Sequence, residues 1–254
     1  MEKSMKFAAI MIALVTLAAG PAFSSGEEEN GSFTISGIDS VIVNAGPLDV
    51  QVNAGNRFSV SVRADLPRDF LFDSRGYRVV RQRSGSRLSI QVRSDSPFGM
   101  TGAGRLLLEV PRETRLRAES SSGRVAVDGI EGDTCSIRTV SGRVTVRNVR
   151  AGLTVDTVSG DVSIDSFEGG LNAKTVSGSI KGRGIAFTED SAFSTVSGNV
   201  DIRVDSSLDD IRFDLSSVSG PLVVGGISAQ RGLRMGFGDV SIRAHTVSGS
   251  LIFQ

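Results

Sequence analysis

The chain of 254 residues has few of the side chains on which disulfide, redox and metal chemistry depend. It contains one cysteine, one histidine, one tyrosine and no tryptophan. A single cysteine excludes a disulfide framework, and a single histidine excludes a metal site built from several imidazoles. The formal net charge is zero, which argues against broad binding to nucleic acids or anionic membranes. We therefore expect neither a cofactor nor a nucleic-acid partner.

Glycine and small apolar residues are abundant instead. The chain has 30 glycines, and its residues are 39% hydrophobic, 22% charged and only 6% aromatic. This is the composition of a folded globular chain rather than a disordered one. Many glycines and few aromatics favour short strands joined by tight turns.

The first residues have the pattern of a secretory signal peptide. Lys3 and Lys6 precede an apolar run over Phe7–Ala19, and small residues follow up to Ser24. The run is shorter than the ~20 residues that a membrane span needs. We expect residues 1–24 to be cleaved, which leaves an exported chain without a transmembrane segment. The sequence does not distinguish a periplasmic, cell-surface or secreted location.

The strongest pattern in the chain is an internal repeat of Thr-Val-Ser-Gly and its variants. The glycines that end successive copies lie 18–22 residues apart: Gly123, Gly142, Gly160, Gly178, Gly198 and Gly220. A repeat of this length predicts a solenoid. A degenerate copy at 236–238 and a last copy ending at Gly249 are closer together, so we expect a half-coil to close the far end.

Each copy is predicted to form two short strands around a corner. Leu153–Thr157 and Asp161–Asp165 alternate between apolar and polar residues, which is typical of β-strands. We expect Gly160 to take a positive φ at the first corner and Phe167–Gly170 to form the second. The residues two and four positions after each glycine are apolar except at Gly182, so they are expected to face an interior.

Two columns of outward residues alternate in charge when the copies are aligned. They are Glu119, Arg138, Asp156 and Lys174, and Asp128, Arg147, Asp165 and Arg183. Parallel stacked coils place equivalent residues ~4.8 Å apart, where alternation converts repulsion into attraction. We therefore predict an all-β, single-stranded parallel β-helix or β-solenoid with coils of ~18–20 residues. Asp156 should lie beside Arg138 or Lys174.

The part of the chain before the repeats is also predicted to be β-structure. We expect a flexible acidic start at 25–30, an irregular N-terminal β cap at 31–118 and the repeat solenoid at 119–254. The predicted strands of the cap are Phe33–Ile35, Val41–Val43, Leu48–Val52, Phe58–Arg63, Arg78–Arg81, Leu88–Val92 and Leu106–Val110.

Two loops and one acidic cluster are candidate sites. Phe70, Phe72, Phe98 and Met100 lie in loops of the cap, where they either bind a partner or fold over the end of the solenoid. Asp205, Asp209, Asp210 and Asp214 form the densest acidic cluster, in the longest repeat interval. They are candidates for Ca²⁺ binding or for glycan cleavage, because both use several carboxylates.

The remaining reactive residues fit structural roles better. His245 falls in the outward column of Arg138 and Asp156, with no nucleophile and orienting acid identified beside it. Cys135 shares a column with Leu116 and Leu153 and is expected to be an inert core residue. We assign no catalytic residue and no metal ligand.

The opening Phe33-Thr34-Ile35-Ser36-Gly37-Ile38 and the repeated Thr-Val-Ser-Gly-x-Val-x-Val resemble a bacterial family of adhesin-like domains. These β-strand-repeat domains of unknown function occur in exported and envelope-associated proteins. The resemblance covers roughly residues 31–254 and implies a right-handed β-helix or β-roll. It brings no catalytic residues. We expect no lipobox, translocator barrel or wall anchor, so the sequence does not predict direct surface attachment.

Three hypotheses about function follow. The leading one is a non-enzymatic exported solenoid, a binding, adhesin-like or envelope-associated scaffold whose partner is an unidentified envelope protein or glycan. The alternative is a glycan-cleaving parallel β-helix enzyme that uses the acidic cluster. A third is a structural or stress-sensing envelope component that binds a membrane protein. The sequence leaves the oligomeric state open.

Overall fold

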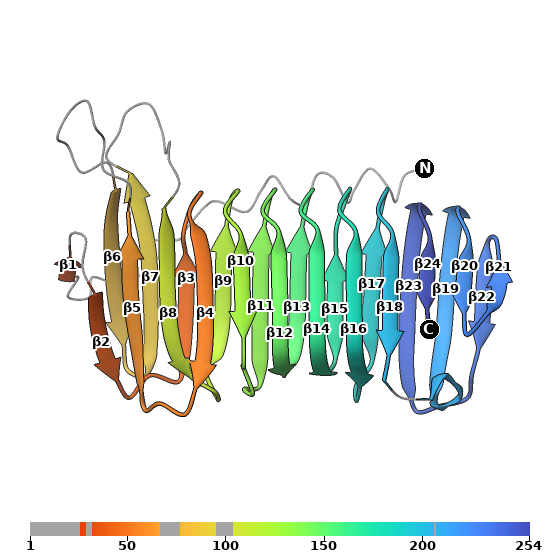
Figure 1. The fold of residues 1–254 in the computed structure, drawn as a ribbon, viewed down its shortest axis with the longest axis horizontal. Coiled ribbons are helices and arrows are strands. Elements are labelled where there is room, and N and C mark those ends of the chain that lie inside the picture. Colours follow the sequence, from red (N-terminus) through yellow and green to blue (C-terminus); the bar gives the residue numbers. More distant parts are fainter. Residues whose placement is uncertain (1–25, 29–31, 67–76, 95–103, 206) are drawn as a thin grey trace.

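The computed structural model describes residues 26–28, 32–66, 77–94, 104–205 and 207–254. The expected signal peptide lies outside these residues. The described chain folds into two sheets of twelve strands each, and a short 3₁₀ helix, η1 (Leu208–Asp210), is inserted near the C-terminus. The strands of both sheets are stacked along one long axis (Figure 1).

The first sheet contains, in spatial order, β1 (Gly26–Glu28), β6 (Tyr77–Ser84), β7 (Arg87–Ser94), β3 (Ser40–Asn44), β9 (Arg115–Ser120), β11 (Thr134–Thr139), β13 (Gly152–Thr157), β15 (Leu171–Lys174), β17 (Ser191–Thr195), β23 (Val240–Ser248), β19 (Ile211–Ser219) and β22 (Gly232–Met235). The second sheet contains β2 (Ser32–Ser36), β5 (Ser59–Asp65), β8 (Arg105–Pro111), β4 (Asp49–Gly55), β10 (Val125–Asp128), β12 (Val144–Arg150), β14 (Val162–Gly169), β16 (Ile180–Phe187), β18 (Val200–Val204), β24 (Leu251–Phe253), β20 (Leu222–Val224) and β21 (Ile227–Ala229).

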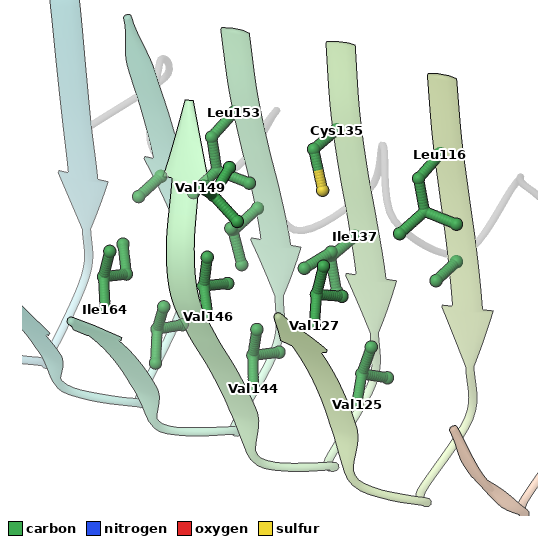
Figure 2. Packing of buried hydrophobic residues seen from close by; sticks show 14 of the residues in the cluster. Leu116, Val125, Val127, Cys135, Ile137, Val144, Val146, Val149, Leu153 and Ile164 are labelled. Atoms are coloured by element: carbon green, nitrogen blue, oxygen red, sulfur yellow. The ribbon is translucent and has the colours of Figure 1, made fainter. Parts of the chain in front are cut away.

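Each central coil contributes one strand to each sheet, as the alternating sequence predicts. The inward residues of the two sheets fill a single continuous core. Leu116, Cys135 and Leu153 lie side by side on β9, β11 and β13 (Figure 2), as expected from the repeat. Val127 and Val146 come from the second sheet, and both are buried. Burial of each such side chain contributes about 1.5–3 kcal/mol, so the stacked core stabilises the β-solenoid that the sequence predicts.

The first corner of each central coil is formed by the Thr-Val-Ser-Gly motif. The threonine is buried, and its Oγ1 accepts a hydrogen bond from the N–H of the glycine three residues later. The donor–acceptor distance is 3.0 Å for Thr157 and Gly160 and 2.8 Å for Thr195 and Gly198. The serine of the motif is exposed in the central copies, as at Ser159.

The corner glycines are required for close stacking rather than for a positive φ. A Cβ on Gly160 would overlap the carbonyl oxygen of Gly142 in the preceding coil, and Gly178 is in the same position relative to Gly160. Gly160 does not have the positive φ that the sequence analysis expected. Backbone therefore packs directly on backbone along this edge, where only glycine fits.

A second bend follows the outward charged residue on the strands of the second sheet. Gly129, Asn148, Ser166 and Gly184 occupy it in successive coils, all with positive φ between 51° and 80°. In β14 the bend at Ser166 comes before Gly169, where the strand ends. The sequence analysis expected the second corner at Phe167–Gly170 and did not anticipate this additional bend.

The two ends of the solenoid differ from the central coils in the order of their strands. The pair β3 and β4 lies between β7 and β8 on one side and β9 and β10 on the other. At the other end β23 and β24, the last strands of the chain, lie between β17 and β18 and β19 and β20. Both ends finish in antiparallel pairs, β1–β6–β7 with β2–β5–β8 and β19–β22 with β20–β21.

The expected half-coil at the far end is therefore wrong. Leu251 and Phe253 are fully buried on β24, inside the ladder rather than at its end. The degenerate copy at 236–238 is not a corner of a coil either, because it joins the antiparallel β22 to β23. Spacing alone could not reveal that the last coil is inserted out of chain order.

All seven strands predicted in the cap are present as β2 to β8. These strands join the same two sheets as the repeats. Where the sequence analysis expected a flexible start, Gly26–Glu28 pairs with β6. Near this end the guanidinium of Arg81 lies 4.9 Å from the ring centroid of Phe33, which is a cation–π contact across the two sheets. The charge of Arg81 over Phe33, which lies on the end strand β2, discourages further strands from adding.

Candidate functional site

The outward column of the first sheet contains a run of charge pairs. Arg138 Nε donates to Asp156 Oδ2 at 3.3 Å, and Arg138 Nη1 lies 4.0 Å from Glu119 Oε1. Arg117 Nη2 also forms an ion pair with Glu119 Oε1 at 2.6 Å. Lys174 is the in-register neighbour of Asp156. The predicted adjacency is confirmed. Each such surface pair contributes only about 0.2–1 kcal/mol, so the column sets register more than it adds stability.

The charge column of the second sheet is also in register. Asp128, Arg147, Asp165 and Arg183 are successive neighbours on β10, β12, β14 and β16. The Asn148 amide donates to the Asp128 carboxylate at 2.9 Å. Both predicted columns therefore lie on the outer surface, one on each sheet.

The acidic cluster does not form one site. Asp205 follows β18, Asp209 and Asp210 lie in η1, and Asp214 lies on β19, where it accepts a hydrogen bond from Arg234 Nε at 3.1 Å. Within the described part of the chain, no group of three or more His, Cys, Asp or Glu side chains could hold a metal ion. The four residues are close in sequence, but the turn before β19 places them on different elements.

His245 lies on the outer face of the first sheet, as its column predicts. It is exposed, and its Nδ1 lies 3.0 Å from Ser216 Oγ on the adjacent β19. Its in-register neighbour on β17 is Ser194. A serine beside a histidine is part of the arrangement that activates a nucleophile, but this pair lies on an exposed strand face.

Among the described residues, two titratable groups have shifted pKa values. Burial raises the pKa of the Cys135 thiol to about 12, so the thiolate is suppressed and the side chain acts as a small core residue. A hydrogen bond from the Ser241 backbone N–H, 2.9 Å long, lowers the pKa of the Asp190 carboxyl. This carboxylate connects the turn before β17 to β23 and has a structural role.

The loop candidates Phe70, Phe72, Phe98 and Met100 lie outside the described residues. Among the described residues, two aromatic side chains are exposed in turns: Phe58 between β4 and β5, and Phe237 between β22 and β23.

A hollow of about 320 Å³ opens on the outer face of the second sheet, at β16 and β18. Its lining consists of Lys181, Gly182, Arg183, Asp201 and Arg203. The three cationic side chains are exposed and Asp201 is half-buried. The register between β16 and β18 shifts just after Gly182.

Sequence reasoning missed this hollow, although two signals were present. The alternating column predicts an acid after Arg183, but the next coil has Arg203. Gly182 is the single exception in the apolar columns, and the side chains of Ile202 and Ile185 occupy the space that a larger residue there would need. The sequence analysis noted Gly182 only as an exception in the interior columns and did not follow the charge column to Arg203.

Comparison with known proteins gives a family match over the repeats. The model of the Toastrack DUF4097 family matches residues 112–250. No curated protein matches the chain. A crystal structure of a candidate cell adhesion protein from Clostridium sporogenes is similar at 5% identity with a TM-score of 0.39, covering 91% of this chain and 99% of that one. Among the described residues, no helix is long and apolar enough to cross a membrane.

Proposed function

We propose that this chain, which belongs to the Toastrack DUF4097 family, is an exported, non-enzymatic binding and scaffolding module of the cell envelope. Its partner is an envelope protein or glycan that lies along the outer strand face of the solenoid. The predicted signal peptide at residues 1–24 supports export.

The observation that carries this proposal is the continuity of the outer faces. The coils from β9 to β17 stack in register, so outward side chains repeat every ~4.8 Å along both sheets. The charge pairs around Arg138 hold this face in a fixed arrangement before any partner arrives. A rigid, pre-organised surface loses little conformational freedom on binding, which favours a recognition role.

The placement of the reactive residues supports the non-enzymatic part of the proposal. Asp214 is paired with Arg234, while Asp209 and Asp210 lie on a separate turn. Glycoside hydrolysis needs two carboxyl groups placed on either side of the scissile bond. His245 has a serine neighbour on an exposed face, where water would compete with any substrate.

The test is saturable binding by immobilised residues 25–254 to envelope extract and to a glycan panel. A first-sheet variant combines Ser136→Glu, Thr154→Lys and Asn172→Glu, which continue the alternation along one outward column. The matched second-sheet variant combines Thr145→Lys and Ser163→Glu on the opposite outer face. We expect one variant to lose binding by about 10-fold or more, because a face must be complementary to its partner, while the other changes it less than about 2-fold.

Two results would contradict the proposal. Binding that neither face variant weakens would show that the strand faces are not the recognition surface. Release of product from a polysaccharide panel, lost on replacing Asp209 and Asp210 by asparagine, would establish the enzymatic alternative.

A further inference from the structure

We propose that the hollow between β16 and β18 is a binding site for a single oxyanion, a carboxylate, sulfate or phosphate group, held by Arg183, Arg203 and Lys181. The inference rests on the proposed function, because it names a ligand class for one part of the outer face. Of its three cations, Arg183 belongs to a predicted charge column, and Lys181 and Arg203 belong to neither the charge columns nor the acidic cluster.

The charge around the hollow is uncompensated, unlike that around Arg138 on the first sheet. Arg138 is in contact with acids on both neighbouring strands. Among the described residues, by contrast, the side chains of Lys181, Arg183 and Arg203 make no hydrogen bond or ion pair. Three cations and one carboxylate, that of Asp201, therefore line one small hollow.

The acids nearest to these cations do not neutralise them. Asp165 is the in-register neighbour of Arg183, and Asp201 is the neighbour of Lys181. Neither carboxylate forms an ion pair with a described residue. Two arginines on adjacent strands repel each other when nothing lies between them. An anion between the guanidinium groups would reverse the sign of that interaction.

The chemistry and size of the hollow define the ligand class. Guanidinium groups bind carboxylate, sulfate and phosphate oxygens through paired, charge-assisted hydrogen bonds. The volume of about 320 Å³ is at the small end of ligand sites and accommodates one anionic group with part of its carrier. The hollow lies on an exposed sheet face, so the group can belong to a free ion or to an acidic sugar.

Gly182 lies in the lining of the hollow, between two of its cations. A side chain there would meet Ile202 and Ile185 from within the core. The glycine is buried, while Lys181 and Arg183 on either side of it are exposed. The strand thus presents both cations to the same face while its register shifts toward β18.

The experiment is an NMR titration that follows the arginine Nε–H signals of the 25–254 chain. The probes are inorganic sulfate, inorganic phosphate and a galacturonic acid trimer, with a neutral galactose trimer as the control ligand. We expect the anions to shift the Arg183 and Arg203 signals saturably and the neutral trimer to shift neither. Tighter binding of the acidic trimer than of the free ions assigns the oxyanion to a sugar, and the reverse order assigns it to a free ion.

A variant with Arg183→Gln and Arg203→Gln should weaken anion binding by about 10-fold or more, because each arginine supplies charged hydrogen bonds. The matched control, Arg124→Gln with Arg147→Gln, removes the same charge from exposed positions outside the hollow and should change the affinity less than about 2-fold. An equal loss in both variants, or no shift with any anion, overturns the inference.

These results separate the site from the proposed function. If envelope extract binds saturably while no anion shifts the arginine signals, the oxyanion site is wrong and the binding role stands. If the anions bind at Arg183 and Arg203 but no envelope partner or glycan is recovered, the site stands and the proposed function is wrong.

Discussion

The central corners and the corners near the C-terminus use the same motif with different hydrogen bonds. In the centre, Thr195 Oγ1 accepts the Gly198 N–H at 2.8 Å. In the last copy, the Gly249 N–H donates instead to the Ser219 carbonyl at 3.1 Å, and the buried Oγ1 of Thr246 has no partner among the described residues. The identical tetrapeptide is therefore satisfied within its own coil in one region and by a neighbouring coil in the other.

The backbone conformation of the motif glycine also differs between the two regions. Gly220 and Gly249 have φ values of 136° and 152°, whereas the central glycines do not have positive φ. Central strands are parallel on both sides, but β19 and β20 each have one antiparallel neighbour at the end. In the centre, each coil repeats the parallel pairing of the coil before it. At the end, antiparallel strands replace this pairing, which protects the solenoid from adding further strands.

The largest expected effect comes from removing the last strand. Deletion of residues 251–254 removes Leu251 and Phe253, which are fully buried between β18 and β20. We expect a loss of at least ~5 kcal/mol in unfolding free energy, since buried Phe and Leu truncations cost ~3–5 and ~2–5 kcal/mol each. Urea denaturation followed by far-UV circular dichroism measures it.

The control for that deletion is Ile227→Ala on the outermost strand β21, where the side chain is 55% exposed. It should cost less than ~1 kcal/mol. Similar small effects for both changes would mean that the chain terminus frays and is not an inner strand.

The next largest effect compares a glycine at a close-packed corner with a glycine that has open space around it. Gly178→Ala places a Cβ against the Gly160 carbonyl and should cost ~3 kcal/mol or more, because the stacked backbones must separate. Gly55→Ala, where no atom lies near the added group, should stay within ~0.5 kcal/mol. Thermal unfolding midpoints of the two variants make the comparison, and equal midpoints would refute the close-approach account.

A smaller effect tests the threonine hydrogen bond directly. Thr157→Val removes the acceptor of the Gly160 N–H and should cost ~1–2 kcal/mol, since a buried donor loses its partner. Thr246→Val removes a hydroxyl without a partner and should be neutral or stabilising. Urea midpoints decide, and a greater loss at Thr246 would reverse the proposed difference between centre and end.

The smallest effect concerns the charge pairs. A double-mutant cycle on Arg138→Gln and Asp156→Asn should give a coupling of ~0.2–1 kcal/mol that falls with added salt. The pair Arg234 and Asp214 at the antiparallel end, with side chains 83% and 48% exposed, should couple more weakly. Stronger coupling at the end would show that alternation does not set the central register.

Much of the architecture could be predicted from repetition because stacking converts sequence period into spatial adjacency. The pairing of Arg138 with Asp156 and the burial of Cys135 both followed from alignment of the copies. Alternation also identified the cap strands without any repeat. The local sequence pattern is sufficient to predict the fold where each residue lies beside the residues at the same repeat position in the preceding and following coils.

Local pattern fails where neighbours are not consecutive in the chain. Nothing in residues 246–254 indicates that β23 inserts between β17 and β19 and β24 between β18 and β20, because pairing with either neighbour satisfies the same alternation. The role of Gly160 was misassigned because a close backbone approach and a positive φ select the same residue. The hollow was missed because the charge column was followed only as far as Arg183 and not to Arg203 in the next coil.

The stacking order is tested most directly by paired cysteines in a Cys135→Ala background. Ser194 and His245 are in-register neighbours on adjacent strands, so cysteines at 194 and 245 should form a disulfide in the folded monomer. Cysteines at 194 and 216 should not, because His245 lies between them and two strand spacings amount to ~9.6 Å. A disulfide between 194 and 216 without one between 194 and 245 would contradict the inserted last coil.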